Sequence, residues 1–151
     1  MTFDAKTVSF PPDDVRDDAP LGGYYQDFGD ALDLVHRGVH GPMDPEGRPL
    51  ATYGGGAPHY SSILIAQYAL ACVPGARAGD QVCLARLRMQ AEWLIAQQER
   101  DGLREGYWIQ RFDNQKYPTL CAPWVSALAQ GNAISALLRA REILGKEAYL
   151  G

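Results

Sequence analysis

The stretch from Pro123 to Gly145 constrains the fold of this 151-residue chain more than any other. It reads PWVSALAQGNAISALLRAREILG, and Gly131 is the one residue inside it that disfavours a helix. Proline is favoured in the first turn of a helix, and glycine is favoured just beyond the last turn. The stretch therefore predicts one long helix that begins at Pro123 and ends at Leu144.

One face of this predicted helix carries almost no side-chain volume. Ala127, Gly131 and Ser135 recur at four-residue intervals, whereas leucine and isoleucine occupy much of the remaining surface. A glycine inside a helix costs about 1 kcal/mol relative to alanine, so we expect a compensating close approach by another helix or by a ligand. Tight helix packing is the simpler of these two interpretations.

Two further helices are predicted from apolar periodicity and from the residues that begin and end helices. The first runs from Ser61 to Val73 and ends at Pro74. The second runs from Asp80, a good N-cap, to Glu99, with Gln90 on its polar side. The chain is therefore expected to be mainly α-helical.

Between residues 103 and 117 apolar and polar residues alternate loosely, which predicts a short β-hairpin or an irregular loop with Asn114 near its tip. This stretch mixes basic and aromatic residues, a combination that suits stacking on sugars and pairing with their carboxylates as well as it suits a solvated loop. Trp93 is interpreted as a packing residue in preference to a sugar platform. The mixed residues are Arg104, Tyr107, Trp108, Arg111, Lys116 and Tyr117.

Composition and charge exclude several classes of function. A net charge of −4, with no cluster of Lys and Arg, argues against nucleic-acid binding. No apolar stretch is long enough to span a membrane, and residues 1–20 lack the features of a secretory signal, so we expect a cytoplasmic protein. The three cysteines follow no metal-binding spacing and are expected to be small buried hydrophobic residues.

Residues 1–20 differ in composition from the rest of the chain. They are rich in aspartate and proline and cannot bury enough apolar surface to offset the loss of entropy on folding. We therefore expect a mobile or extended arm over residues 1–20, followed by one folded region over residues 21–151.

Metal and cofactor sites are not indicated. Asp27, Asp30 and Asp33 lack the spacing of a calcium loop, and the pair His36 and His40 encloses a glycine that disfavours a helix. The glycine run at residues 54–56 lacks the Lys-Ser/Thr pair of a nucleotide-binding loop, which leaves a packed or flexible loop or an anion site at a helix start. We expect no metal and no cofactor.

A family resemblance is carried by residues 123–140, PWVSALAQGNAISALLRA, with support from three shorter segments. The long segment resembles the Trp-x-Ser-Ala-x-Ala-Gln-Gly-x-Ala-x-Ser-x-Leu-x-Arg-Ala signature of the D-glucuronyl C5-epimerase C-terminal domain. The shorter segments are Ile65 to Leu70, Trp93 to Gln98, and Tyr24-Tyr25-x-Asp27-Phe28, which extend the resemblance over residues 22–151.

The resemblance implies a fold as well as an activity. The family's fold is an α/α toroid, which contains many more helices than the three predicted here, so residues 21–151 are expected to form an incomplete array of α-hairpins. Apolar helix faces would then be exposed unless the remainder of such a domain or a second copy of the chain covers them.

The implied reaction inverts C5 of D-glucuronate residues in a heparosan-type polysaccharide and gives L-iduronate. It needs two acid/base groups on opposite faces of the sugar ring. The family's acid/base tyrosines and arginine have no counterparts at matching positions of this chain, so the catalytic residues are unassigned and weak or no activity is expected from these residues alone.

Two functions remain open at this stage. The first is an epimerase, or part of one, that takes a uronate-containing polysaccharide as its substrate. The second is a non-catalytic α-helical module that binds a glycan or a partner protein. In either case the candidate binding residues are Tyr53, His59, Gln67, Trp124 and Gln130.

Overall fold

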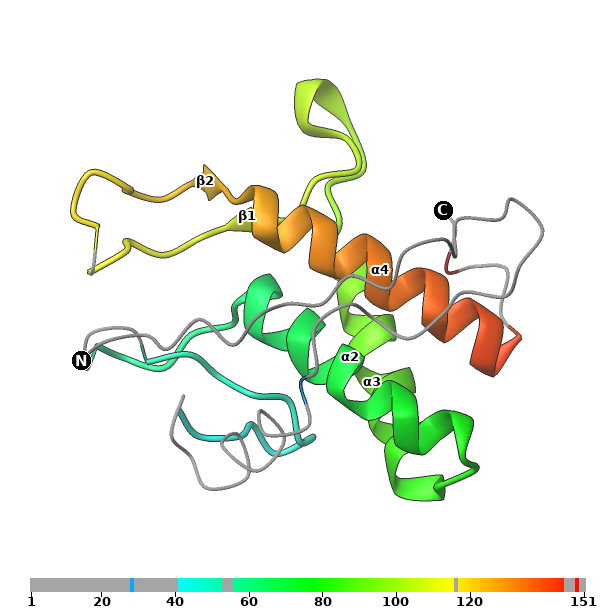
Figure 1. Cartoon of the computed structure of the whole chain (residues 1–151). Coiled ribbons are helices and arrows are strands. Elements are labelled where there is room, and N and C mark those ends of the chain that lie inside the picture. Colours follow the sequence, from blue (N-terminus) through cyan, green and yellow to red (C-terminus); the bar gives the residue numbers. More distant parts are fainter. Residues whose placement is uncertain (1–27, 29–40, 53–55, 116, 146–148, 150–151) are drawn as a thin grey trace, which may run out of the picture.

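The structure, a computed structural model, describes residues 28, 41–52, 56–115, 117–145 and 149 (Figure 1). Within these residues the fold is mainly α-helical, as predicted, and includes a short two-stranded antiparallel sheet, but the second strand lies at residues 124–125 and not within the predicted stretch 103–117. The elements are helix α2 (Ser62–Arg77), helix α3 (Gln81–Gln97), the 3₁₀-helix η2 (Gly102–Arg104), strand β1 (Ile109–Gln110), strand β2 (Trp124–Val125) and helix α4 (Ala127–Leu144).

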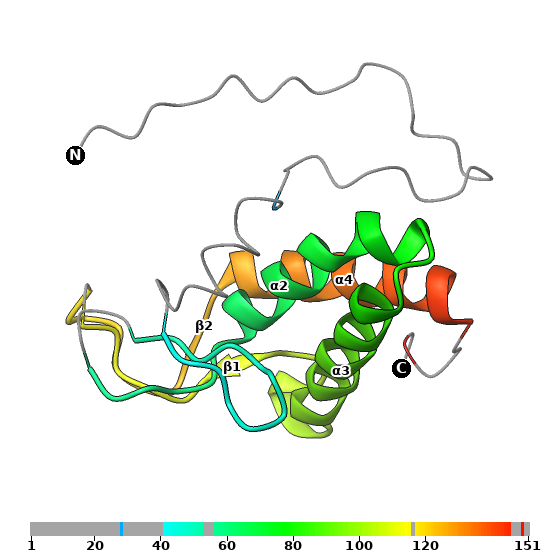
Figure 2. The same cartoon turned by 90° about the horizontal axis from the view of Figure 1, so that it is seen from below.

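Helix α2 lies at the centre of the packing. It contacts both α3 and α4, which share a smaller contact with each other (Figures 1 and 2). The small and branched apolar side chains of α2 are buried on several sides of the helix. Ile65, Ala66, Ala69 and Cys72 have no exposed surface. The loop that joins β1 to β2 extends away from this three-helix core on the side where α4 begins.

The predicted end of α2 at Val73 is wrong, because the helix continues through Pro74 to Arg77. Pro74 is exposed and its carbonyl oxygen accepts a hydrogen bond from the backbone N–H of Ala78, at 3.1 Å. A proline removes one backbone donor, so the helix loses a single hydrogen bond at this position. The buried Ala76 keeps this turn packed on the core.

Asp80 is confirmed as the N-cap of α3. Its Oδ1 accepts hydrogen bonds from the backbone N–H groups of Val82, at 2.8 Å, and Cys83, at 3.1 Å. The predicted apolar stripe is correct at Leu87, but Gln90 is not on a polar side, because its side chain is fully buried. Its amide has no hydrogen-bond partner within the described part of the chain.

The predicted start of α4 at Pro123 is also wrong. Residues 124 and 125 are extended and pair with β1, so the helix begins only after Ser126, whose Oγ accepts a hydrogen bond from Ala129 N–H. The end of the helix is confirmed. Gly145 adopts the left-handed conformation, with φ of 68°, and its N–H donates to the carbonyl oxygen of Arg141 at 2.8 Å.

The face that carries Gly131 does not pack against another helix in the described structure, contrary to expectation. Gly131 is exposed, and a Cβ at this position would meet no described atom within 4 Å. Leu128 and Ile134 on the same side are 50% and 51% exposed. The buried side of α4 instead carries a row of alanines, of which Ala133, Ala136 and Ala140 belong to the hydrophobic core and Ala129 is also fully buried.

Some expectations concern residues outside the described ranges. These are the arm over residues 1–20, the tyrosines at 24 and 25, the aspartates at 27, 30 and 33, the histidine pair at 36 and 40, and Tyr53. Among the described helices, none combines the length and apolar character that crossing a membrane requires.

Candidate functional site

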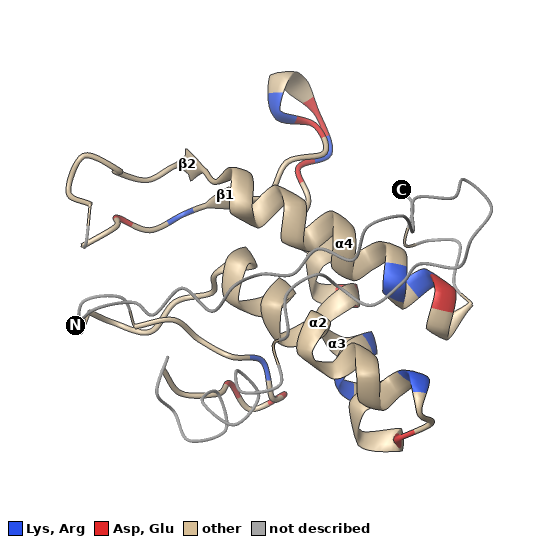
Figure 3. Cartoon of the chain, in the orientation of Figure 1, with Lys and Arg blue, Asp and Glu red and all other residues tan. Residues whose placement is uncertain are grey.

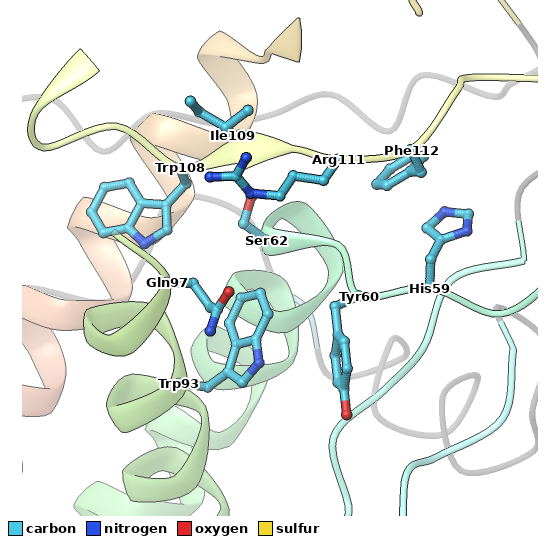
Figure 4. A pocket seen from close by; sticks show the side chains of 9 residues that line it. All are labelled: His59, Tyr60, Ser62, Trp93, Gln97, Trp108, Ile109, Arg111 and Phe112. Carbon is cyan, nitrogen blue, oxygen red and sulfur yellow. The ribbon is translucent and has the colours of Figure 1, made fainter. Parts of the chain in front are cut away.

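A pocket of about 280 Å³ opens where three segments meet beside α3 (Figure 4). The first segment leads into α2, the second is the C-terminal half of α3, and the third surrounds strand β1. Together they contribute His59, Tyr60, Ser62, Trp93, Gln97, Trp108, Ile109, Arg111 and Phe112. This volume is at the small end of the range for ligand pockets.

Trp108 gives the pocket a rigid base. Its side chain is 3% exposed, and its indole Nε1 donates to the carbonyl oxygen of Leu94 at 2.7 Å. Its backbone N–H donates to Oε1 of Gln130 at 3.0 Å, and its carbonyl oxygen accepts from Nε2 of Gln130 at 2.8 Å. Helices α3 and α4 therefore hold this residue from two directions.

A buried polar contact fixes strand β1 to the first turn of α2. Nε2 of Gln110 donates a hydrogen bond to Oγ of Ser62, and both side chains are almost entirely shielded from solvent. A buried polar group is costly unless it is hydrogen-bonded, so each side chain keeps the other in place. The strand that carries Arg111 at its end is thereby positioned relative to α2.

Aromatic rings form two walls of the pocket. On one side the rings of Tyr60 and Trp93 lie with centroids 5.6 Å apart and are tilted by 34°. On the other side His59 stacks on Phe112 at 3.7 Å, and Phe112 meets Trp124 edge to face at 5.6 Å. The indole of Trp124 also donates to the carbonyl oxygen of Phe112 at 2.7 Å, which holds the second wall together.

The hydroxyl of Tyr60 is engaged outside the pocket. It donates a hydrogen bond to Oδ2 of Asp44 at 2.9 Å, and this bond, together with burial, raises the pKa of the phenol. Burial alone would raise the pKa of Asp44, but hydrogen bonds from the Arg48 backbone and from Tyr60, with the charge of Arg48, lower it overall. The ring of Tyr60 therefore lines the pocket, while its hydroxyl donates a hydrogen bond to Asp44.

Arg111 supplies the permanent positive charge of the pocket lining. Its side chain is 65% exposed, and its guanidinium is paired with the carboxylate of Glu99, which is 24% exposed. Glu99 is held by its backbone, because its N–H donates to the carbonyl oxygen of Tyr107 and its carbonyl oxygen accepts from Gly106, both at 2.9 Å. Figure 3 shows that the loop between α3 and β1 carries charged residues of both signs.

The arrangement suits the binding of an anionic sugar. Aromatic faces such as those of Trp93 and Tyr60 can stack on the apolar face of a sugar ring, and a guanidinium can pair with a carboxylate through two parallel hydrogen bonds. Among the described residues no group of three His, Cys, Asp or Glu side chains lies close enough together to hold a metal ion.

The five candidate binding residues are not brought together in one place. His59 lines the pocket, and Trp124 supports the same wall through Phe112. Gln130 lies behind the pocket, where it holds the backbone of Trp108. Gln67 is half-buried on α2 and is not part of the pocket lining, and Tyr53 lies outside the described residues.

Several lining residues were not selected from the sequence. Tyr60 directly follows His59, and Phe112 directly follows Arg111, so both were neighbours of residues already singled out. Trp93 packs against the hydrophobic core, as expected, and its half-buried side chain also lines the pocket. Its role in the pocket could have been inferred from its position near the end of a helix, where a side chain can reach a loop as well as the core.

Comparison with known proteins supports the family resemblance over part of the chain. The model of the family described as D-glucuronyl C5-epimerase C-terminus matches residues 101–151, which supports the resemblance and an epimerase-related origin for this part of the chain. The match includes Trp108, Arg111 and Phe112 of the pocket and all of α4. No curated protein and no solved structure matches the chain.

Proposed function

We propose that the pocket binds uronate residues of a polysaccharide and forms part of one wall of a substrate cleft in a C5-epimerase-like domain. The observation that carries this proposal is the position of Arg111, a permanent cation beside the rings of Trp93 and Tyr60. A uronate offers the complementary pair of features, a sugar ring and a carboxylate. The family match over residues 101–151 supports the same choice of ligand.

Binding is a better assignment for this pocket than proton transfer. Inversion at C5 removes a proton next to the carboxylate and returns one to the opposite face of the ring, which requires two positioned acid/base groups. Tyr60 already donates its proton to Asp44, and its pKa is raised, mainly by that bond. We therefore propose that the chain by itself has weak or no epimerase activity, and we assign no catalytic residue.

The domain organisation follows from the same proposal. Residues 21–151 would form part of an α/α toroid, in which α2, α3 and α4 belong to an incomplete array of α-hairpins, and residues 1–20 would form a separate arm. The exposed apolar side chains on α4, such as Ile134, agree with an array that continues beyond these helices. We further propose that the protein acts in the cytoplasm.

A binding experiment tests the proposed function. A heparosan hexasaccharide and its carboxyl-reduced counterpart, which is neutral, would be titrated into the protein and followed by calorimetry. We expect the acidic oligosaccharide to bind more tightly, and we expect Arg111→Gln to remove most of this preference. Arg104→Gln is the matched control, because Arg104 is an exposed arginine on the neighbouring loop and does not line the pocket. Equal binding of both sugars, or no binding of either, would contradict the proposal.

Proton exchange tests whether the chain alone is catalytic; a non-catalytic binding module is the alternative function. Heparosan would be incubated with the protein in deuterated water, and the label at C5 would be measured by mass spectrometry. We expect little or no label from this chain alone. Substantial incorporation would show that this chain removes the C5 proton and returns one from solvent, and it would contradict the proposal of weak or no activity.

A further inference from the structure

The ion pair between Arg111 and Glu99 places an acidic side chain of the protein on the one permanent cation of the described pocket lining. We propose that Glu99 occupies the carboxylate subsite when no ligand is bound, and that a ligand carboxylate must displace it. This inference rests on the proposed function, because it takes Arg111 as the residue that binds the uronate carboxylate. It makes Glu99 a residue that sets the affinity of the site.

The geometry favours an exchange of partners at Arg111. The arginine side chain is 65% exposed and therefore accessible to a ligand, whereas Glu99 is 24% exposed and is held by two backbone hydrogen bonds to the loop that ends at Tyr107. The pair joins residues twelve positions apart in the sequence and links the end of α3 to the end of β1. When the pair opens, the guanidinium can turn toward a ligand while Glu99 stays close to the subsite.

The energetics also favour exchange. Ion pairs between exposed side chains are weak because water solvates both charges, so the Arg111–Glu99 pair can be broken by a ligand that offers a second carboxylate. The Glu99 carboxylate would then remain within a few ångströms of the bound carboxylate and repel it, since the Debye length at physiological ionic strength is about 8 Å. Competition and repulsion both lower affinity for anions and leave neutral sugars unaffected.

The inference predicts that Glu99→Gln tightens binding of the acidic oligosaccharide. The substitution keeps the shape of the side chain and removes its charge. We expect the Kd of the heparosan hexasaccharide to fall by about 1.5-fold to fivefold, the range expected when a weak surface ion pair no longer competes. The Kd of the carboxyl-reduced hexasaccharide should not change.

Matched variants separate this inference from a general effect of charge. Glu105→Gln removes the same charge from an exposed position on the same loop and should leave both affinities unchanged. In an Arg111→Gln background, Glu99→Gln should have no effect beyond that of Glu105→Gln, because no subsite is left for Glu99 to occupy. The melting temperature of each variant, followed by circular dichroism, checks that the fold is intact.

The outcomes distinguish the two proposals. If Arg111→Gln weakens binding of the acidic hexasaccharide but Glu99→Gln leaves it unchanged or weakens it, the competing role of Glu99 is wrong and the proposed function stands. An equal gain from Glu99→Gln and Glu105→Gln would also overturn the role of Glu99. If neither the parent nor Glu99→Gln binds the acidic hexasaccharide, both proposals fail.

Discussion

Helix α4 carries two rows of small residues, and the structure uses them differently. Ala129, Ala133, Ala136 and Ala140 have no exposed surface, and the last three belong to the hydrophobic core. Ala127 and Gly131 are exposed, and Ser135 is half-buried. Small residues permit another element to approach the helix closely. The larger apolar residues beside each row decide which row is buried. Leu137 accompanies the alanine row, whereas Leu128 and Ile134 project from the other side.

The largest expected effect concerns these larger residues. Leu137 is 6% exposed in the core, so Leu137→Ala should lower the free energy of unfolding by about 2–5 kcal/mol through lost burial and a residual cavity. Ile134→Ala, three positions earlier at a 51% exposed site, should change it by no more than about 0.5 kcal/mol. Urea denaturation measures both values, and similar losses would show that both faces of α4 are packed.

An added side chain should distinguish the two rows of small residues directly. Ala133→Leu inserts extra volume into a fully buried site and should cost about 1–3 kcal/mol. Ala127→Leu adds the same atoms at an exposed site in the first turn of the same helix and should be close to neutral. Equal denaturation midpoints for the two variants would contradict the conclusion that only the alanine row is buried.

Gly131→Ala should stabilise the protein by about 0.5–1 kcal/mol, because a Cβ meets no described atom within 4 Å and alanine favours the helix. Gly75→Ala in α2 is the matched control. There a Cβ would lie 2.5 Å from Sγ of Cys83, so the gain in helix propensity should be offset by a clash between α2 and α3. A loss of melting temperature in Gly131→Ala would mean that the Gly131 face is packed after all.

The smallest effect is expected at the ion pair that joins the ends of α2 and α4. Arg77 donates to the carboxylate of Glu142 at 3.0 Å, and the two side chains are 30% and 34% exposed. Glu142→Gln should lower the free energy of unfolding by no more than about 1 kcal/mol, and the effect should shrink in high salt. A larger, salt-resistant loss would indicate that this pair, and not only the alanine row, holds α4 on the core.

The sequence predicted the helices better than their boundaries. The side chain of Asp80 caps α3, and the left-handed backbone of Gly145 ends α4. Both effects depend only on neighbouring residues, so the sequence could predict them. The effects of Pro74 and Pro123 could not be predicted, because they depend on contacts made elsewhere. Ala76 is buried against the core beyond Pro74, and residues 124 and 125 pair with a strand that precedes them by fifteen positions.

The site was harder to predict than the fold, because its lining comes from three separate segments. The sequence singled out His59, Trp108 and Arg111 by residue type, but it could not show that they share one pocket with Trp93. Gln130, which lies in the segment that carries the family resemblance, is among the residues expected from the sequence to bind the glycan. The structure shows its amide engaged with the backbone of Trp108 behind the pocket, a contact that depends on how α4 meets β1.

In the contact between Gln130 and Trp108, a side-chain amide makes the hydrogen bonds that a neighbouring strand would otherwise make. In the β1–β2 register Ile109 pairs with Val125, so the next pair in this register would be Trp108 facing Ser126. Ser126 caps α4 instead, and the amide of Gln130 both accepts from and donates to the Trp108 backbone as a strand residue would. Exchange of the Trp108 amide proton with solvent should therefore report opening of the first turn of α4, so the edge of the hairpin and the start of the helix open as one unit.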